Sequence, residues 1–427
     1  MGLQTMVKLT RNMLQSDKLF DKIADELDIS PSLYKTAVEH YTAIGNWLDE
    51  INLTDVFKGS EDPIPAGKIR AEIFPQGSFA LGTVVKPWRN GEEQEYDIDL
   101  VFQLDLEVGT KQAYALKKAV GERLKSHGSY SQILKEEGKR CWTIAYAEHN
   151  NIQFHLDILP ALNGQSISRT PYRNSAISIS DKVDSNLYQW LPSNPRGYAE
   201  WFKEKNFIAF NRIVDFERKK KLSMETISAT VHDVPDQFIR TPLQRAIQIL
   251  KRHRDVRFSG IPNEKEKPIS MIITTLAALS YDNEESISFT LENIINKLLS
   301  YKSLLCNGRA PINMPKLIEL TADGKWIIRN PVCFEENFAD KWHLDGHKRA
   351  KAFFQWLDWL EQDMAALVEH MEQAHQKTLL EEKFGSRVAA AVVPLTASTG
   401  ASSLLISNMH TGDIVIDSPA QPWRCEA

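Results

Sequence analysis

The segment YDIDLVF, residues 96–102, constrains the fold more strongly than any other part of this chain. Successive side chains of a β-strand point to opposite faces of its sheet. As a strand, the segment places Asp97 and Asp99 together on one face, while the apolar residues between and beside them point into a core. The sequence therefore predicts a sheet that carries two neighbouring carboxylates on its exposed face.

A later segment, QFHLDILP (residues 153–160), repeats this alternation and puts Asp157 on the polar face together with His155. If the two strands are neighbours, three carboxylates converge, and their repulsion raises their pKa values unless cations neutralise them. Magnesium prefers oxygen ligands and is held by carboxylates together with substrate phosphates. We therefore expect a divalent metal to bind Asp97, Asp99 and Asp157. A structural or supporting role is expected for His155.

The segment FPQGSFALGT, residues 74–83, adds a phosphate-binding feature shortly before these carboxylates. Gly77 has no Cβ, so the backbone can approach a phosphate closely, and the hydroxyl of Ser78 can donate a hydrogen bond to it. An Asp-x-Asp sequence alone arises by chance on the order of once in a chain of this size. The combination is more specific and favours phosphoryl transfer at a two-metal site. The alternative is that the aspartates are solvated strand residues and that Gly77 marks an ordinary turn.

Hydrophobic spacing predicts that the first half contains two helices followed by a mixed sheet. Apolar residues at helical spacing over residues 11–57 predict two helices, separated at Ser30 and Pro31, with the second ending near Phe57. Residues 163–195 are rich in Ser, Asn, Pro and Arg and are expected to form long loops. Strands are predicted over residues 68–79, 95–105, 140–148 and 152–159, and a helix over residues 112–125.

The second half is predicted to be all-helical, which makes the fold class α+β. Helices are expected over residues 198–221, 241–254, 268–278, 290–301 and 347–382. The chain after Pro394 has a composition that cannot support a core of its own. The expected domains are N-terminal helices packing on the catalytic core (1–57), a catalytic domain (58–205), a helical nucleotide-binding domain (206–385) and a flexible tail (386–427).

Bulk composition narrows the class of protein and its partners. A chain of 427 residues exceeds one hydrophobic core, so at least two packed units are expected. The net charge of -5 argues against a protein that coats nucleic acid, although a small anionic substrate needs only local positive charge. The cysteines form no CxxC pair, which argues against a disulfide framework or a zinc knuckle and indicates a reducing cytoplasm. No apolar run approaches the ~20 residues of a membrane span, so neither secretion nor membrane insertion is expected.

A glycine-serine pair, an Asp-x-Asp strand and a later aspartate together resemble the signature of the polymerase-β-like nucleotidyltransferases. Within that superfamily, six segments follow the order found in the CD-NTases, the cyclic GMP-AMP synthase and DncV-like nucleotidyltransferases of the bacterial anti-phage system CBASS. They are PQGSFALGT, YDIDLVF, FHLDILP, LQRAIQILKRHRD, KPISMIITTLAA and NPVCFEENFADKW. The resemblance covers residues 35–385 and implies a polymerase-β-like catalytic domain with a mixed sheet, followed by an all-helical domain.

The resemblance also implies roles for single residues. It assigns two magnesium ions, with manganese as an alternative, to the three aspartates, and it assigns the donor triphosphate to Gln76, Gly77 and Ser78. Lys251 is similar to a family lysine that meets the triphosphate, and Ser270 is similar to a serine near the same nucleotide. A lysine there is a point charge suited to phosphate. Without the resemblance, the alternative is that Lys251 and its neighbouring arginines form a solvated helix face.

The function implied by the resemblance is template-independent synthesis of a cyclic di- or trinucleotide from ATP, GTP or other ribonucleoside triphosphates, with release of pyrophosphate. The product would activate a downstream effector in anti-phage defence. In some CBASS operons a ligase joins the synthase C-terminus to other molecules, and the chain end at Ala427 is compatible with this. Direct activation by DNA is not expected, because the chain has no His/Cys cluster with the spacing of a zinc site.

Two other functions use the same residues. An RNA- or tRNA-tailing nucleotidyltransferase would place the aspartates opposite a polymer acceptor, which a basic groove would favour and the acidic composition does not. A catalytically silent nucleotide-binding regulator would retain the fold without turnover. The intact Asp97, Asp99 and Asp157 argue against that alternative.

Overall fold

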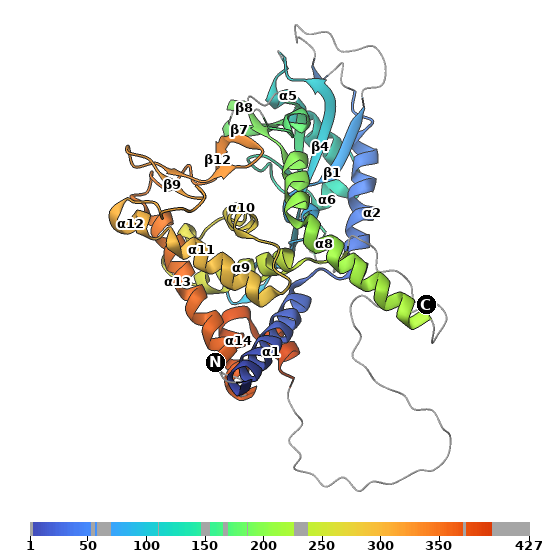
Figure 1. Cartoon of the computed structure of the whole chain (residues 1–427). Coiled ribbons are helices and arrows are strands. Elements are labelled where there is room, and N and C mark those ends of the chain that lie inside the picture. Colours follow the sequence, from blue (N-terminus) through green and yellow to red (C-terminus); the bar gives the residue numbers. More distant parts are fainter. Residues whose placement is uncertain are drawn as a thin grey trace, which may run out of the picture.

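The computed structural model describes residues 3–52, 56–57, 70–109, 111–146, 154–164, 170–185, 187–225, 238–369 and 373–394, with the backbone alone for residues 3–14, 220–225 and 373. These residues form a half built on a sheet and a helical half, joined through the long helix α8 (Pro195–Glu225) (Figure 1). None of the described helices is long and apolar enough to cross a membrane.

The main sheet is mixed, as the sequence predicts. Its order is β1-β4-β6-β7-β8, and β5 also pairs with β6. Strands β4 and β6 run parallel to each other, whereas the other pairs in this sheet are antiparallel. The strands are β1 (Ala71–Pro75), β4 (Tyr96–Glu107), β5 (Trp142–Ala145), β6 (Phe154–Asn163), β7 (Ile177–Asp184) and β8 (Leu187–Ser193).

One face of this sheet is covered by helices α2 (Pro31–Leu48) and α5 (Ala113–Lys125), as Figure 1 shows. The side chain of Ser30 accepts a hydrogen bond from the amide of Leu33 and Pro31 is the first helical residue, so the predicted helix start is confirmed. Alternate residues of the central strands are buried in the core beneath these helices. The opposite face carries the aspartates and, further along the strands, a second and smaller apolar cluster of Val101, Leu159, Ala161, Ile177 and Ile179.

The helical half is formed by α8 to α15 together with the first helix, and short β-pairs interrupt it. The pairs β9–β10 and β11–β12 fall within the region predicted to be all-helical. The remaining elements are α1 (Leu3–Leu27), α9 (Pro242–Phe258), α10 (Ser270–Ser280), α11 (Ile287–Ser300), α12 (Ser303–Asn307), β9 (Glu319–Leu320), β10 (Trp326–Ile327), β11 (Arg329–Asn330), β12 (Cys333–Asn337), α13 (Lys348–Glu369), α14 (Gln373–Phe384) and α15 (Ser386–Val392).

One polar face of α9 holds the loop that connects the two chemically important segments of the sheet half. The loop, residues 81–86, lies between α4 (Gly77–Ala80) and the hairpin of β2 (Trp88–Arg89) and β3 (Glu92–Glu93). Residues three or four positions apart on a helix lie on the same face, so four side chains of α9 can reach the loop together. They donate to its carbonyls: Gln244 to Leu81 at 2.9 Å, Gln248 to Val84 at 3.1 Å, Lys251 to Thr83 at 3.1 Å and Arg252 to Lys86 at 3.2 Å.

The two N-terminal helices pack on different halves, contrary to the prediction that both pack on the catalytic core. The buried apolar residues of α1 belong to the core of the helical half, whereas those of α2 belong to the core under the sheet. Asp28 lies at the junction of α1 and α2. Its carboxylate oxygens are 3.0 Å from Arg240 Nε and accept a hydrogen bond from Gln248 Nε2 at 3.0 Å. These contacts connect the junction of α1 and α2 to α9.

Two further expectations about element bounds were wrong. Helix α2 ends at Leu48 rather than near Phe57, since Leu48 is its last buried residue and the following Asp49 and Asn52 favour a helix end. Residues 163–195 are not only loops, because they contain the hairpin of β7 and β8. Its inward residues alternate with serines, so the strand pattern is present but the serine content suggested a loop. The helix expected over residues 347–382 is described as two helices, α13 and α14.

The predicted C-terminal tail begins too early. Residues 386–392 form α15, which packs against α14 and α1. Three of its side chains, Val388, Ala389 and Val392, are buried in the core of the helical half. Three small or β-branched residues in seven were too short a pattern to predict this helix. The rest of the predicted tail, residues 395–427, lies outside the described part of the chain.

Adjacent alanines of α15 provide a matched test of this packing. Ala389→Asp should lower the free energy of unfolding by about 3 kcal/mol or more, because it buries an unpaired carboxylate. Ala390→Asp, on the exposed side of the same helix, should change it by less than about 0.5 kcal/mol. Chemical denaturation of both variants measures the difference. Equal stability of the two variants would show that α15 is not part of the core.

Candidate active site

The parallel pairing of β4 with β6 brings the three predicted aspartates together. Asp99 lies directly opposite Asp157, and Asp97 lies opposite His155. Their neighbours along both strands, such as Ile98 and Leu156, are fully buried on the other face. The alternation that the sequence shows therefore places the carboxylates on one face of two adjacent strands, as predicted.

The aspartates form a site of concentrated negative charge. Burial, together with the charges of Asp97 and Asp157, raises the pKa of Asp99 to about 7. Burial also raises the pKa of Asp157, although the hydroxyl of Thr143 on β5 donates a hydrogen bond to its carboxylate and opposes that shift. At neutral pH the protein thus holds ionised carboxylates together at a cost in stability, which a bound cation would offset.

His155 is part of this cluster, although only a structural or supporting role was expected for it from the sequence. Its Nε2 lies 3.2 Å from Asp97 Oδ1, and its Nδ1 lies 3.8 Å from Glu95 Oε2. The hydrogen bond with Asp97 raises the pKa of His155. One ligand atom each from Asp97, His155 and Asp157 lies within 4.8 Å of the others. The sequence already placed His155 on the polar face, but the sequence alone did not show whether this histidine is a metal ligand or a supporting residue.

The Gly77 segment, residues 76–78, lies directly against the aspartates. The amide of Gln76 donates to the carbonyl of Asp99 at 2.8 Å, so the end of β1 continues the sheet up to the site. Gly77 has φ +57°, and a Cβ there would lie 3.0 Å from Asp99 Oδ2. A side chain at this position would strain the backbone and press on the carboxylate. Ser78 follows at the start of α4, and its carbonyl accepts from the amide of Thr83 at 2.9 Å.

Lys251 lies behind this segment and is not part of a solvated helix face. The lysine is 3% exposed, and its neighbours Arg252 and Arg254 are also buried. Its Nζ donates to the carbonyl and the hydroxyl of Thr83, at 3.1 Å and 3.0 Å. Burial and the charge of Arg254 lower the pKa of Lys251 to about 7, while Asp99 opposes this shift. Thr83, which joins the Gly77 segment to this lysine, carries no signal of this role in the sequence.

Ser270 lies in a different set of contacts. It is the first residue of α10, and its Oγ accepts a hydrogen bond from Arg254 Nη1 at 3.1 Å. The same guanidinium donates to the carbonyl of Pro268 at 2.9 Å and to Asp255 at 2.9 Å through Nε. Arg254 and Lys251 are three positions apart on α9, so Ser270 contacts the same side of the helix that carries Lys251.

The donor set fits a hard divalent cation. The aspartates offer carboxylate oxygens on one face, and their mutual repulsion is evident in the raised pKa of Asp99. Gly77 leaves a space beside Asp99 Oδ2 that a Cβ would fill. Oxygen ligands with room for a phosphate oxygen are the arrangement that Mg²⁺ prefers.

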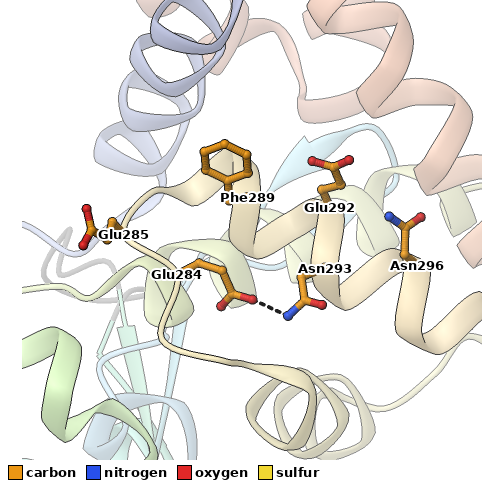
Figure 2. Close-up of a pocket in the computed structure, with 6 residues that line it drawn as sticks. All are labelled: Glu284, Glu285, Phe289, Glu292, Asn293 and Asn296. Atoms are coloured by element: carbon orange, nitrogen blue, oxygen red, sulfur yellow. Dashed lines mark hydrogen bonds between the residues drawn. The ribbon is translucent and has the colours of Figure 1, made fainter. Parts of the chain in front are cut away.

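A separate cavity of about 480 Å³ lies on α11 in the helical half. Figure 2 shows that Glu284 and Asn293 point toward each other across it and are joined by a hydrogen bond. Three carboxylates on its lining repel a triphosphate, so this cavity is unsuited to the nucleotide. Its lining residues are Glu284, Glu285, Phe289, Glu292, Asn293 and Asn296.

Known proteins are similar to this chain both in sequence and in fold. The family model described as "Cyclic GMP-AMP synthase DncV-like, nucleotidyltransferase domain" matches residues 71–160. The chain is 28% identical over 374 residues to a c-di-GMP synthase from Roseivirga ehrenbergii, covering 87% of this chain and 85% of that protein. It is 26% identical over 255 residues to the cyclic dinucleotide synthase CdnG from Bradyrhizobium diazoefficiens, covering 57% of this chain and 54% of that protein.

Solved structures agree with the predicted fold class. The Bradyrhizobium diazoefficiens CD-NTase CdnG in complex with GTP superposes with a TM-score of 0.62 at 20% identity, covering 89% of this chain and 98% of that one. CdnC from E. coli MS115-1, solved with ATP, gives a TM-score of 0.53 at 16% identity, covering 87% and 98%. This similarity confirms a nucleotidyltransferase fold with a mixed sheet and a helical region.

The charge at Asp99 has a measurable effect on stability. Because its pKa rises from 3.8 to about 7 on folding, the folded state binds more protons between these values, and stability falls as the pH rises through this window. Asp99→Asn should therefore stabilise the metal-free protein by roughly 1 to 3 kcal/mol at about pH 8 and by less at about pH 5. Thermal unfolding at both pH values measures this.

The control is Asp105→Asn, at the exposed end of the same strand and outside the cluster of carboxylates, which should change the melting temperature at about pH 8 by less than Asp99→Asn does. A lower melting temperature for Asp99→Asn at about pH 8 would contradict the electrostatic account of the site.

Proposed function

We propose that this chain is a CD-NTase that makes a cyclic dinucleotide from ribonucleoside triphosphates and releases pyrophosphate. The match of residues 71–160 to the DncV-like nucleotidyltransferase model and the 28% identity to a c-di-GMP synthase support this proposal. The observation that carries the proposal is the parallel pairing that sets Asp99 opposite Asp157, with Asp97 on the same face. GTP is the proposed first substrate, since one relative is named a c-di-GMP synthase and the solved CdnG is in complex with GTP. ATP is the proposed alternative.

Asp97, Asp99 and Asp157 are proposed to hold two Mg²⁺ ions, with Mn²⁺ as an alternative. When bound, such ions supply a lowered pKa for the attacking hydroxyl and positive charge for the leaving phosphate. The carboxylates also orient the acceptor, because they project from adjacent strands that cannot move independently. His155, 3.2 Å from Asp97 Oδ1, holds that carboxylate in place from the side.

The Gly77 segment and α9 are proposed to receive the donor triphosphate. Gln76, Gly77 and Ser78 offer backbone approach and a hydroxyl donor next to Asp99. Lys251 would exchange its hydrogen bonds to Thr83 for phosphate oxygens, and the phosphate charge would raise its pKa from about 7. Ser270 would act through Arg254 on the same side of the nucleotide.

The reaction follows from these positions. An acceptor ribose oxygen attacks the donor's α-phosphorus and loses its proton. The bond from that phosphorus to the bridging oxygen breaks, and pyrophosphate leaves with the electron pair. A second, equivalent step within the linear intermediate closes the ring. The cyclic product is proposed to act on an effector in anti-phage defence in the cytoplasm. The protein is proposed to work without direct activation by DNA. Its C-terminal tail is a candidate substrate for a ligase.

Product analysis tests the proposed function. The purified protein should convert GTP, alone or with ATP, and Mg²⁺ to a phosphatase-resistant cyclic dinucleotide detected by mass spectrometry. The double variant Asp97→Asn, Asp99→Asn should reduce pyrophosphate release by at least about 100-fold, because the charge of the transition state loses its stabiliser. Asp105→Asn should retain wild-type activity. Product from the double variant would refute the assigned site, and transfer only to added RNA would indicate a tailing enzyme.

Lys251 provides a separate test of the triphosphate position. Lys251→Met keeps the length of the side chain but removes its charge, and it should weaken binding of GTP by roughly 10-fold to 100-fold, the loss expected for a charged hydrogen bond. The exposed Lys265→Met is the control and should bind GTP as the wild type does. Calorimetric titration with a non-hydrolysable GTP analogue measures both. Unchanged affinity of Lys251→Met would place the triphosphate elsewhere.

A further inference from the structure

Glu93, at the end of β3, is held between two arginines from distant parts of the chain. Arg252 of α9 donates from Nη2 to Glu93 Oε1 at 2.7 Å. Arg387 of α15 donates from Nε to Oε2 at 2.8 Å and from Nη2 to Oε1 at 3.0 Å. Although burial raises the pKa of Glu93, its bonds to Arg387 and Arg252 hold that pKa below its usual range. We call these three residues the Glu93 clamp.

The C-terminal end of the described chain is fitted to the hairpin that carries Glu93. Gly385, between α14 and α15, has φ +94°, and a Cβ there would lie 2.4 Å from the ring of Trp88 on β2. Arg252 also donates to the carbonyl of Phe384 at 3.2 Å. Arg387 reaches Glu26 of α1 as well, at 2.9 Å. The hairpin, α9, α1 and α15 therefore meet around Glu93 and Arg387, with Arg252 on the buried side and Arg387 partly exposed.

A short series of contacts connects the Glu93 clamp to the aspartates. Strand β4 begins at Tyr96, shortly after Glu93, so fixing the hairpin fixes the start of the catalytic strand. Glu95 lies 3.8 Å from His155 Nδ1, and His155 Nε2 lies 3.2 Å from Asp97 Oδ1. The hairpin's other arm leads back through the loop of residues 81–86 to Gly77. Both segments of the proposed site thus start from the clamped hairpin.

The clamp is not needed to attach α15. The buried Val388, Ala389 and Val392 already anchor that helix in the core. The side chain of Arg252 is fully buried and that of Glu93 is 14% exposed, and buried ion pairs contribute little net stability because desolvation offsets their attraction. A bidentate guanidinium–carboxylate pair does impose a defined geometry. The Glu93 clamp therefore fixes the position of the hairpin more than it stabilises the fold.

We propose that Glu93, Arg252 and Arg387 are positioning residues that set the start of β4 and hence Asp97, so that α15 is a working part of the active site. This inference rests on the proposed function. It predicts that loss of Arg387 impairs turnover although no atom of that residue reaches the aspartates. Displacement of a reacting group on the order of 1 Å costs up to ~100-fold in rate.

The test compares Arg387→Gln with Arg349→Gln, which breaks a partly exposed ion pair between Arg349 of α13 and Asp345 just before that helix. Arg387→Gln should lower kcat for GTP about tenfold and leave KM within about twofold. It should also speed hydrogen exchange at the amides of residues 96–99 about tenfold. Arg387→Lys keeps the charge but cannot bind both carboxylate oxygens as a guanidinium does, so its kcat and exchange rates should fall between those of Arg387→Gln and the wild type. Arg349→Gln should match the wild type in both measurements.

Hydrogen exchange separates this inference from the proposed function. If the wild type forms no product, the proposed function fails, while the exchange rates of residues 96–99 still decide whether the Glu93 clamp holds β4. Unchanged exchange and unchanged kcat in Arg387→Gln, measured below its melting temperature, would show that Arg387 acts only as a surface contact. An equal fall in kcat for Arg349→Gln would overturn the proposal too.

Discussion

The backbone carbonyls of residues 81–86 depend on donors from a single helix. Buried carbonyls without partners are costly, so a loop of this kind is stable only where donors meet it. Helix α9 provides them from one face, through two amides, a lysine and an arginine. Because the loop runs from Gly77 to the β2–β3 hairpin, the same contacts join the helical half to the sheet and fix the approach to the aspartates.

The charged side chains on either side of this loop lower the stability of the protein alone and favour binding of a ligand. On one side, like charges and burial raise the pKa of Asp99, and on the other, burial lowers the pKa of Lys251. The charged form of each side chain is unfavourable by itself, and a bound cation together with a triphosphate would stabilise both. Natural proteins commonly retain such unfavourable groups at sites where activity requires them.

The aspartates could be predicted from the sequence because a strand's alternation decides which face each side chain takes. The adjacency of β4 and β6 followed from the chemistry that the carboxylates imply. Thr83 and Glu93 could not be predicted, since their roles come from contacts with α9 and α15 at long sequence separation. The hairpin of β7 and β8 was missed because serine content outweighed a valid alternation, and α15 because seven residues carry little periodicity.

The pairing of β4 with both β1 and β6 restricts how this protein can change length. Side chains alternate with a period of two, so removing one residue from β4 would turn every later side chain to the opposite face. Asp99 would then point into the core, and Leu100 would take its place opposite Asp157. A change of one residue before Asp99 would thus remove the carboxylate pair, whereas the register irregularity between Leu104 and Glu107 lies beyond the site and leaves that pair opposed.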